Sequence, residues 1–249
     1  MFDWQTKSVL ARGPQRIAAV MAHPDDADFI CAASCARWVA EGHHVTYVVI
    51  TNGDKGSDDR TLSSEALIAE RRAEQRAAAA ILGVHEVVFM GREDGMLVPN
   101  LELRRELVRV LRRVRPDVVI CQSPNTYYYG ETYINHPDHR AGGVAVIEAV
   151  FPAARNHRYF PELLEEGLEP YKTSEVWISE AAGIDTWVDV TDYLDLKIAA
   201  LRAHPGQMND WDPEEMIRTW AAESGAAADP PVTYAEDYKV MRLHEDDSE

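Results

Sequence analysis

The chain is predicted to be an α/β protein with a Rossmann-like, doubly wound, mostly parallel sheet that carries helices on both faces. Through the first 150 residues, short apolar runs rich in Val and Ile alternate with longer stretches of helical character. Such alternation is typical of parallel strands joined by helices. No linker rich in Pro, Gly or Ser divides the 249 residues. We therefore expect one domain over residues 1–249, with an α/β core at 1–150 and a remainder, 151–249, that completes the sheet and walls one side of the site.

Each expected element follows from a local pattern. A strand is expected where apolar and β-branched residues form a short run, and a helix where apolar residues recur every three to four positions between start and stop signals. Gly42 ends the first helix, Ser63 or Ser64 caps the second, and Gly83 ends it. The expected strands are 16–22, 44–51, 86–90, 117–122, 174–180 and 186–191, the expected helices are 28–41, 63–82, 101–114, 137–150, 192–203 and 213–222, and polar loops are expected at 51–59 and 123–135.

The charge of the chain excludes some partners. Its 25 Lys and Arg stand against 42 Asp and Glu, a formal net charge of −17 at pH 7. An acidic surface repels nucleic acid and anionic membranes. No segment is apolar enough to span a membrane, the N-terminus lacks a secretory signal, and the acidic end at 244–249 is expected to fray. Cys31, Cys35 and Cys121 are too few for a disulfide framework, so we expect a reducing, cytoplasmic location.

Polar and ionisable residues follow each of the first four expected strands. In an open parallel sheet, ligands bind beyond the carboxyl ends of the strands, so chemistry is expected at this edge. A Rossmann dinucleotide site needs Gly-x-Gly-x-x-Gly after the first strand, where this chain has His-Pro-Asp-Asp. A nicotinamide- or flavin-dependent oxidoreductase is therefore disfavoured. The polar segments are 23–26, 52–56, 91–95 and 136–140.

Two of these segments bring imidazole and carboxylate together: His-Pro-Asp-Asp, which begins at His23, and His-Pro-Asp-His, which ends at His139. Zinc favours His nitrogen with carboxylate oxygen, and a catalytic zinc site usually has three protein ligands. His23, Asp26 and His139 form such a set. Asp25 and His136 then remain beside it. Hydrolysis needs such a pair, because a carboxylate can take a proton from water and an imidazole can stabilise the developing charge.

Each segment also has a purely structural explanation. Asp25 or Asp26 can cap the following helix, and two histidines around Pro137 are common on a first helical turn. The metal interpretation is favoured because both segments fall at strand ends of one sheet. We expect Zn²⁺ as the cofactor, and Fe²⁺, Mn²⁺ or Co²⁺ can occupy the same ligands.

Seven motifs lie along the chain. They are MAHPDDADF (21–29), TNGDKGS (51–57), Arg71-x-x-Glu74 followed by AAAAILGV, FMGREDGML (89–97), RPDVVI (115–120), HPDHR (136–140) and DVTDYLDLKIAALRAHPGQ (189–207). Together they resemble the PIG-L/LmbE-like family of zinc-dependent N-acetylglucosaminyl de-N-acetylases. The resemblance covers most of the chain, and HPDD followed by HPDH is its most specific part.

The resemblance implies a role for each residue of the two segments. His23, Asp26 and His139 match the zinc ligands. Asp25 matches the general base that activates water. His136 matches the residue that, in its protonated form, stabilises the oxyanion intermediate and assists departure of the amine. Either Asp25 or His136 can return a proton to the leaving amine.

Further residues match positions around the substrate. Arg71 and Asp94 match positions that hold sugar hydroxyls, with Arg72 as an alternative register for Arg71. In some relatives a tyrosine near the second segment polarises the carbonyl. Here Tyr133, or a tyrosine of the run 127–129, can supply such a hydroxyl.

The implied reaction removes an N-acetyl group from a small molecule or conjugate containing N-acetylglucosamine, giving free amine and acetate. The alternative is an amidase that cleaves a larger amide of a thiol conjugate or a natural-product intermediate. A non-catalytic metal- or sugar-binding module is disfavoured, because pure binding has no need of a base such as Asp25. The resemblance also implies a homo-oligomer, a trimer or hexamer, with a small amino-sugar substrate as partner.

Overall fold

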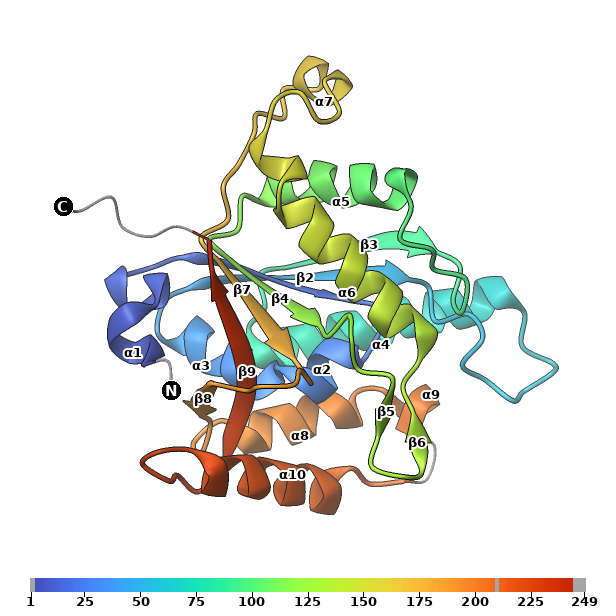
Figure 1. Ribbon diagram of the computed structural model, residues 1–249. Coiled ribbons are helices and arrows are strands. Elements are labelled where there is room, and N and C mark those ends of the chain that lie inside the picture. The colour runs from blue at the N-terminus through green and yellow to red at the C-terminus, as the bar shows by residue number, and fades with distance from the viewer. Residues whose placement is uncertain (1–2, 209–210, 244–249) are drawn as a thin grey trace.

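The structure, a computed structural model, describes residues 3–208 and 211–243 and is built on a seven-stranded sheet (Figure 1). The strand order is β3-β2-β1-β4-β7-β9-β8. The pairs from β3 to β7 are parallel, whereas β9 pairs antiparallel with both of its neighbours. The expected mostly parallel sheet is confirmed. The strands are β1 Arg16–Met21, β2 His44–Thr51, β3 Glu86–Arg92, β4 Val118–Gln122, β7 Glu175–Ser179, β8 Thr186–Asp189 and β9 Ala235–Arg242.

Helices cover both faces of the sheet, as expected for a doubly wound protein (Figure 1). Alternate residues of β1 enter different cores, because successive side chains of a strand point to opposite faces. Ile17 and Ala19 pack with α3, α4 and α8, whereas Ala18 and Val20 pack with α5 and α6. The longer helices are α3 Ala32–Ala40, α4 Ser64–Leu82, α5 Leu101–Val114, α6 Pro137–Val150, α8 Leu194–Arg202 and α10 Glu214–Ala227, and the short ones are α1 Trp4–Lys7, α2 Asp26–Ile30, α7 Glu162–Glu165 and α9 Pro205–Met208.

The helix boundaries follow the capping signals of the sequence. Ser63 accepts the Ala66 N–H at the start of α4, so Ser63 rather than Ser64 is the cap. Gly83 ends α4 in the left-handed conformation that glycine adopts without a Cβ clash. Asn100 caps α5 through the Leu103 N–H. The predicted ranges of these two helices are confirmed to within one residue.

Other predictions need correction. The helix expected at 28–41 is two helices, because the chain leaves helical geometry at Cys31. The loop expected at 123–135 carries a small hairpin, β5 Tyr128–Tyr129 with β6 Tyr133–Ile134. Strand β9 was not expected, because AEDYKVMR mixes charged and apolar residues and lacks an apolar run. The acidic end at 244–249, expected to fray, lies outside the described residues.

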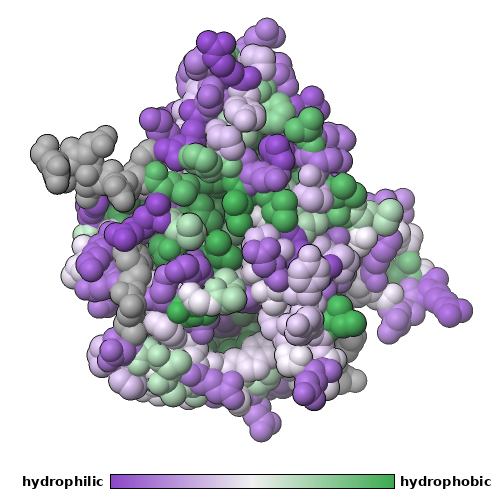
Figure 2. All heavy atoms as spheres, in the orientation of Figure 1, coloured by the Kyte–Doolittle hydropathy of each residue, from purple (hydrophilic) through white to green (hydrophobic). Residues whose placement is uncertain are grey.

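The face that carries α5 and α6 is only partly covered. Figure 2 shows hydrophobic side chains gathered in the middle of the view, where β7, β9 and α6 lie in Figure 1. The exposed apolar residues of the protein include Met241 of β9 and Phe151, which follows α6. Among the described helices, none has the length and hydropathy of a membrane span. The three cysteines are free and buried.

The order of the strands locates the ligand-binding edge. From β1 the chain proceeds outward through β2 and β3, then returns to the other side of β1 as β4. This reversal between β1 and β4 opens a crevice at their carboxyl ends, where ligands bind in open α/β sheets. The Gln122 side chain spans the two strand ends by accepting the Ala22 N–H at 3.0 Å. Both His-Pro-Asp segments lie next to this point.

Candidate metal centre

The first segment turns sharply between β1 and α2. Asp25 has φ +90° and ψ −29°, a left-handed conformation that is uncommon for a residue with a side chain. Its N–H donates to Gln75 Oε1 at 2.8 Å. Asp26 begins α2, and its Oδ2 accepts the His23 N–H at 2.7 Å. The turn therefore places the His23, Asp25 and Asp26 side chains together at the carboxyl end of β1.

The second segment begins α6. His136 is the N-cap, with its Nδ1 accepting the Asp138 N–H at 3.3 Å, and Pro137 takes the first helical position. Gly143 lets α6 approach the end of β4, since a Cβ there would lie 2.4 Å from the Gln122 carbonyl oxygen. This close approach brings His136 and His139 over the crevice.

The three predicted ligands meet around Asp26. Asp26 Oδ2 lies 3.2 Å from His23 Nδ1, and Asp26 Oδ1 lies 3.2 Å from His139 Nε2. Tetrahedral zinc with ligand bonds of about 2.0–2.1 Å would separate its ligand atoms by about 3.3 Å. The ring nitrogens of His23, His136 and His139 also lie within 4.8 Å of one another. These three imidazoles are therefore a group that could hold a divalent metal ion. Asp26 contacts two of them through different oxygens, but it is not a member of either metal-binding group found among the described residues.

Two more carboxylates face the other side of His23. His23 Nε2 lies 3.1 Å from Asp94 Oδ1 and 3.4 Å from Asp138 Oδ2. Burial opposes a charge on His23, yet Asp26, Asp138 and Asp94 together raise its pKa to about 12. Carboxylates that accept the second N–H of a histidine orient it for metal binding. The three carboxylates thus favour positive charge at His23, and Asp94 and Asp138 fix the orientation of its ring.

His23, Asp94, His136 and Asp138 form a second group whose ligand atoms lie within 4.8 Å. Asp138 is already engaged, because its two oxygens accept the N–H groups of Gly95 at 2.7 Å and Leu97 at 3.1 Å. These bonds and the His23 contact lower the pKa of Asp138 against the effect of burial. Asp138 therefore suits a role in orienting His23 better than a role as a metal ligand.

The two residues beside the ligand set have opposite pKa shifts. Burial and the Asp26 charge raise the pKa of Asp25 to about 7. Burial and the neighbouring His23 lower the pKa of His136. His136 is then neutral at pH 7, and since its Nδ1 accepts a backbone N–H, the neutral ring carries its proton on Nε2. This differs from the protonated imidazole expected from the resemblance, but Nε2–H remains a hydrogen-bond donor.

The predicted sugar-binding residues are held inside the protein. The Arg71 side chain is completely buried, and its guanidinium donates to the carbonyl oxygens of Gly56 at 2.8 Å and Gly206 at 3.2 Å. Asp94 contacts His23 and accepts the Lys55 N–H at 3.3 Å. Arg72 donates to Asn52 instead. The sugar-binding roles of Arg71 and Asp94 stay predictions.

Sequence reasoning missed several residues near the site. Gln75 gave no signal, because a glutamine within a helix has no distinctive pattern. Asp138 stood inside a recognised motif but received no role. Tyr129 is partly buried, and burial together with the nearby Glu180 carboxylate raises its pKa. Tyr133 is 58% exposed on β6, so Tyr129 is the better placed of the two tyrosines.

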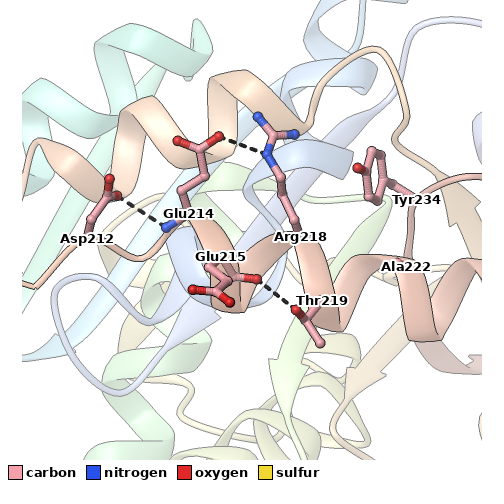
Figure 3. A pocket seen from close by; sticks show the side chains of 7 residues that line it. All are labelled: Asp212, Glu214, Glu215, Arg218, Thr219, Ala222 and Tyr234. Carbon is pink, nitrogen blue, oxygen red and sulfur yellow. Dashed lines mark hydrogen bonds and ion pairs between the residues drawn. The ribbon is translucent and has the colours of Figure 1, made fainter.

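A hollow over α10 is unrelated to this centre. Figure 3 shows its lining, in which the Arg218 guanidinium faces Glu214. Arg218 also pairs with Asp195 at 2.6 Å. Neither metal-binding group found in the described residues lies there. The lining residues are Asp212, Glu214, Glu215, Arg218, Thr219, Ala222 and Tyr234.

Comparison with known proteins gives consistent matches. Residues 18–150 match the profile of the PIG-L family, described as GlcNAc-PI de-N-acetylase. The chain is 30% identical to the diacetylchitobiose deacetylase of Thermococcus kodakarensis, over 83% of this chain and 73% of that protein. It is also 30% identical to the 1D-myo-inositol 2-acetamido-2-deoxy-alpha-D-glucopyranoside deacetylase of Actinosynnema mirum, over 86% of this chain and 88% of that protein.

The fold agrees with a solved structure as well. The N,N'-diacetylchitobiose deacetylase from Pyrococcus horikoshii superimposes with a TM-score of 0.84. The two chains are 29% identical, and the match covers 97% of this chain and 91% of that one.

Proposed function

Because the chain belongs to the GlcNAc-PI de-N-acetylase (PIG-L) family, we propose that it is a metal-dependent hydrolase that removes the N-acetyl group from a small molecule or conjugate containing N-acetylglucosamine. The products are a free amine and acetate. The observation that carries the proposal is the position of Asp26 between His23 and His139, at the turn that also carries Asp25. This arrangement supports a metal-binding set and a base at the carboxyl end of β1.

The proposed ligands are His23 Nδ1, Asp26 and His139 Nε2. Two imidazoles and one carboxylate suit Zn²⁺, and the same donors accept Fe²⁺, Mn²⁺ or Co²⁺. A metal ion here supplies Lewis-acid polarisation of the acetyl carbonyl and lowers the pKa of water. Asp94 and Asp138 orient His23 from its other nitrogen.

Asp25 and His136 perform the proton chemistry in this proposal. Asp25 takes a proton from the attacking water, and a base with a pKa near the working pH is well matched to that task. The water oxygen then forms the bond to the acetyl carbon. The His136 Nε2–H donates to the carbonyl oxygen as negative charge develops on it.

The same two residues were alternatives for protonating the leaving amine. Neutral His136 has one ring proton, which the oxyanion occupies, whereas Asp25 holds the proton taken from water. We therefore assign the return of the proton to Asp25. The carbon–nitrogen bond then breaks, the amine leaves as a neutral group, and the acetic acid that remains gives its proton to the Asp25 carboxylate, which leaves acetate.

Arg71 has a different role in this proposal from the predicted contact with sugar hydroxyls. Its Nη2 donates to two backbone carbonyls and its Nη1 pairs with Glu74 at 3.3 Å, so it acts by tying the loop at Gly56 to α9 at Gly206. Asp94 keeps the predicted contact with a sugar hydroxyl as a second function beside its contact with His23.

The predicted homo-oligomer, a trimer or hexamer, is tested by light scattering of the purified protein.

Amine release from a substrate panel tests the proposed function. The panel contains N-acetylglucosamine, diacetylchitobiose and an inositol-linked N-acetylglucosamine, each with and without chelator and zinc add-back. We expect release that stops with chelator and returns with zinc, and no return in His139→Ala. Protein that holds one metal ion per chain but releases no amine would overturn the sugar de-N-acetylase proposal. Cleavage of a longer acyl amide but no acetamide would instead support the amidase alternative, which the deacetylase relatives do not favour.

A further inference from the structure

A buried hydrogen-bond chain ends on the backbone N–H of Asp25. His204 Nε2 lies 2.9 Å from Asp28 Oδ2, Gln75 Nε2 donates to the same oxygen at 2.7 Å, and the Asp25 N–H donates to Gln75 Oε1 at 2.8 Å. His204, Asp28 and Gln75 are all completely buried. They come from three parts of the chain: the α8–α9 turn, α2 and α4. The chain of contacts ends on the backbone of the proposed base.

That backbone needs support. A residue with a side chain in the left-handed region is strained, and it persists only where its surroundings hold it. The Asp25 carbonyl accepts the N–H groups of Asp28 at 2.8 Å and Phe29 at 3.0 Å, which anchors its following peptide to α2. Gln75 anchors the N–H on the other side. The φ and ψ of Asp25 are thus held between α2 and a side chain of α4.

The orientation of the Gln75 amide is fully determined. Its oxygen must face the Asp25 N–H, and its NH₂ group must face the Asp28 carboxylate, because each partner offers only one kind of hydrogen-bonding group. His204 fixes Asp28 in turn through the same oxygen. A reversed amide would place a donor against a donor and an acceptor against an acceptor.

We propose that Gln75, oriented by Asp28 and His204, is a positioning residue that holds the strained Asp25 backbone so that its carboxyl points at the attacking water. The proposal rests on the proposed function, in which Asp25 is the base. It assigns a role to His204 and Gln75, which act through Asp28 and the Asp25 N–H. Without the Gln75 oxygen, the Asp25 peptide can rotate and carry the carboxyl away from its target.

A double-mutant cycle separates positioning from general stability. We expect Gln75→Leu to lower kcat by about 10- to 100-fold, because a displacement of about 1 Å in a catalytic group can cost that much. KM and metal content should change by less than about twofold. In the Asp25→Asn background, adding Gln75→Leu should cost less than about twofold, since the base on which Gln75 acts is gone. An equal loss of kcat in both backgrounds would overturn the proposal.

Two substitutions of His204 differ in whether they keep a hydrogen-bond donor. His204→Gln can present an amide N–H near the place of Nε2, whereas His204→Leu cannot. We expect His204→Gln to keep most of kcat and His204→Leu to lose it in the same direction as Gln75→Leu. Tyr238→Phe, which removes a buried hydroxyl 3.0 Å from Ser34 Oγ in another part of the core, is the control for loss of a buried hydrogen bond. Equal kcat in the two His204 variants would contradict the proposed relay.

A measurement independent of turnover keeps this proposal distinct from the proposed function. The Asp25 amide should exchange its hydrogen faster in Gln75→Leu than in wild type, while amides in the middle of β1 stay unchanged. Unchanged exchange at Asp25 would overturn the positioning role even in an active enzyme. Wild-type protein that binds metal but deacetylates nothing would overturn the proposed function, with the exchange result still deciding whether Gln75 holds Asp25.

Discussion

The protein buries two clusters of charged side chains that differ in the ratio of cationic to anionic groups. In one, Lys197 Nζ pairs with Glu236 Oε1 at 2.6 Å under α3. Glu236 also accepts the N–H groups of Ala33 at 3.2 Å and Ser34 at 2.8 Å at the start of α3. One cation therefore meets one anion, and the remaining acceptor capacity of the carboxylate is taken by a helix N-terminus.

The metal centre has the opposite composition. Asp26, Asp94 and Asp138 surround His23, and the ion pairs they form within the described residues are all with histidines. A buried carboxylate without an ordinary cationic partner is costly unless a cation is supplied. Balanced buried charges thus mark a structural element, whereas carboxylates in excess around imidazoles mark a donor set for a divalent metal. Four changes test this distinction.

Asp25→Asn should have the largest effect. Asparagine tolerates the left-handed backbone but cannot accept a proton, so kcat should fall by about 10²- to 10⁴-fold with metal retained. His139→Ala should instead lose the metal. Metal content measured beside turnover distinguishes the two. Full activity in Asp25→Asn would show that the base is another residue.

Lys197→Met should affect stability and spare chemistry. Removing one partner of a buried ion pair leaves Glu236 unpaired, which should cost about 3–5 kcal/mol in free energy of unfolding. Urea denaturation at fixed metal concentration measures the change, and kcat per folded molecule should stay as in wild type. Adding Glu236→Gln should recover part of the loss. A drop in metal affinity would contradict the separation of the two clusters.

Asp138→Asn should weaken metal binding by about 10- to 100-fold, the usual cost of losing a partner that orients a metal-binding histidine. The reason is local, since Asp138 holds both His23 Nε2 and the loop at Gly95. Competition with a chromophoric chelator measures the affinity. Asp212→Asn on the surface is the control. Unchanged affinity would leave Asp94 as the residue that orients His23.

The smallest expected effect is the pH dependence. The pKa of Asp25 is raised to about 7 without metal, and a nearby dication lowers it. Asp25 is a base only when deprotonated, so kcat/KM should fall as pH decreases, with a midpoint below 7 in the loaded enzyme. Burial and the neighbouring His23 lower the pKa of His136, so its protonation is not expected to support the rate near pH 7. A rate that rises toward acid would require a protonated His136.

Much of the fold could be predicted from the sequence. Strands β1 to β4 are apolar runs, and α4 and α5 carry caps at both ends, so local signals sufficed. Strand β9 could not be predicted, because its buried Glu236 depends on Lys197 of α8 and on N–H groups of α3, contacts made by tertiary packing.

The family and the deacetylase expectation are confirmed by the comparisons. The sequence by itself determined the class of fold, the edge where chemistry occurs and the residues that could bind a metal, because these depend on local patterns and residue types. Only the tertiary structure decided that Asp26 lies between two imidazoles, that Asp138 Oδ2 lies 3.4 Å from His23 Nε2 and that Gln75 accepts the Asp25 N–H. Distances between side chains far apart in the chain depend on how α4 and α6 pack on the sheet, and no local pattern encodes that packing.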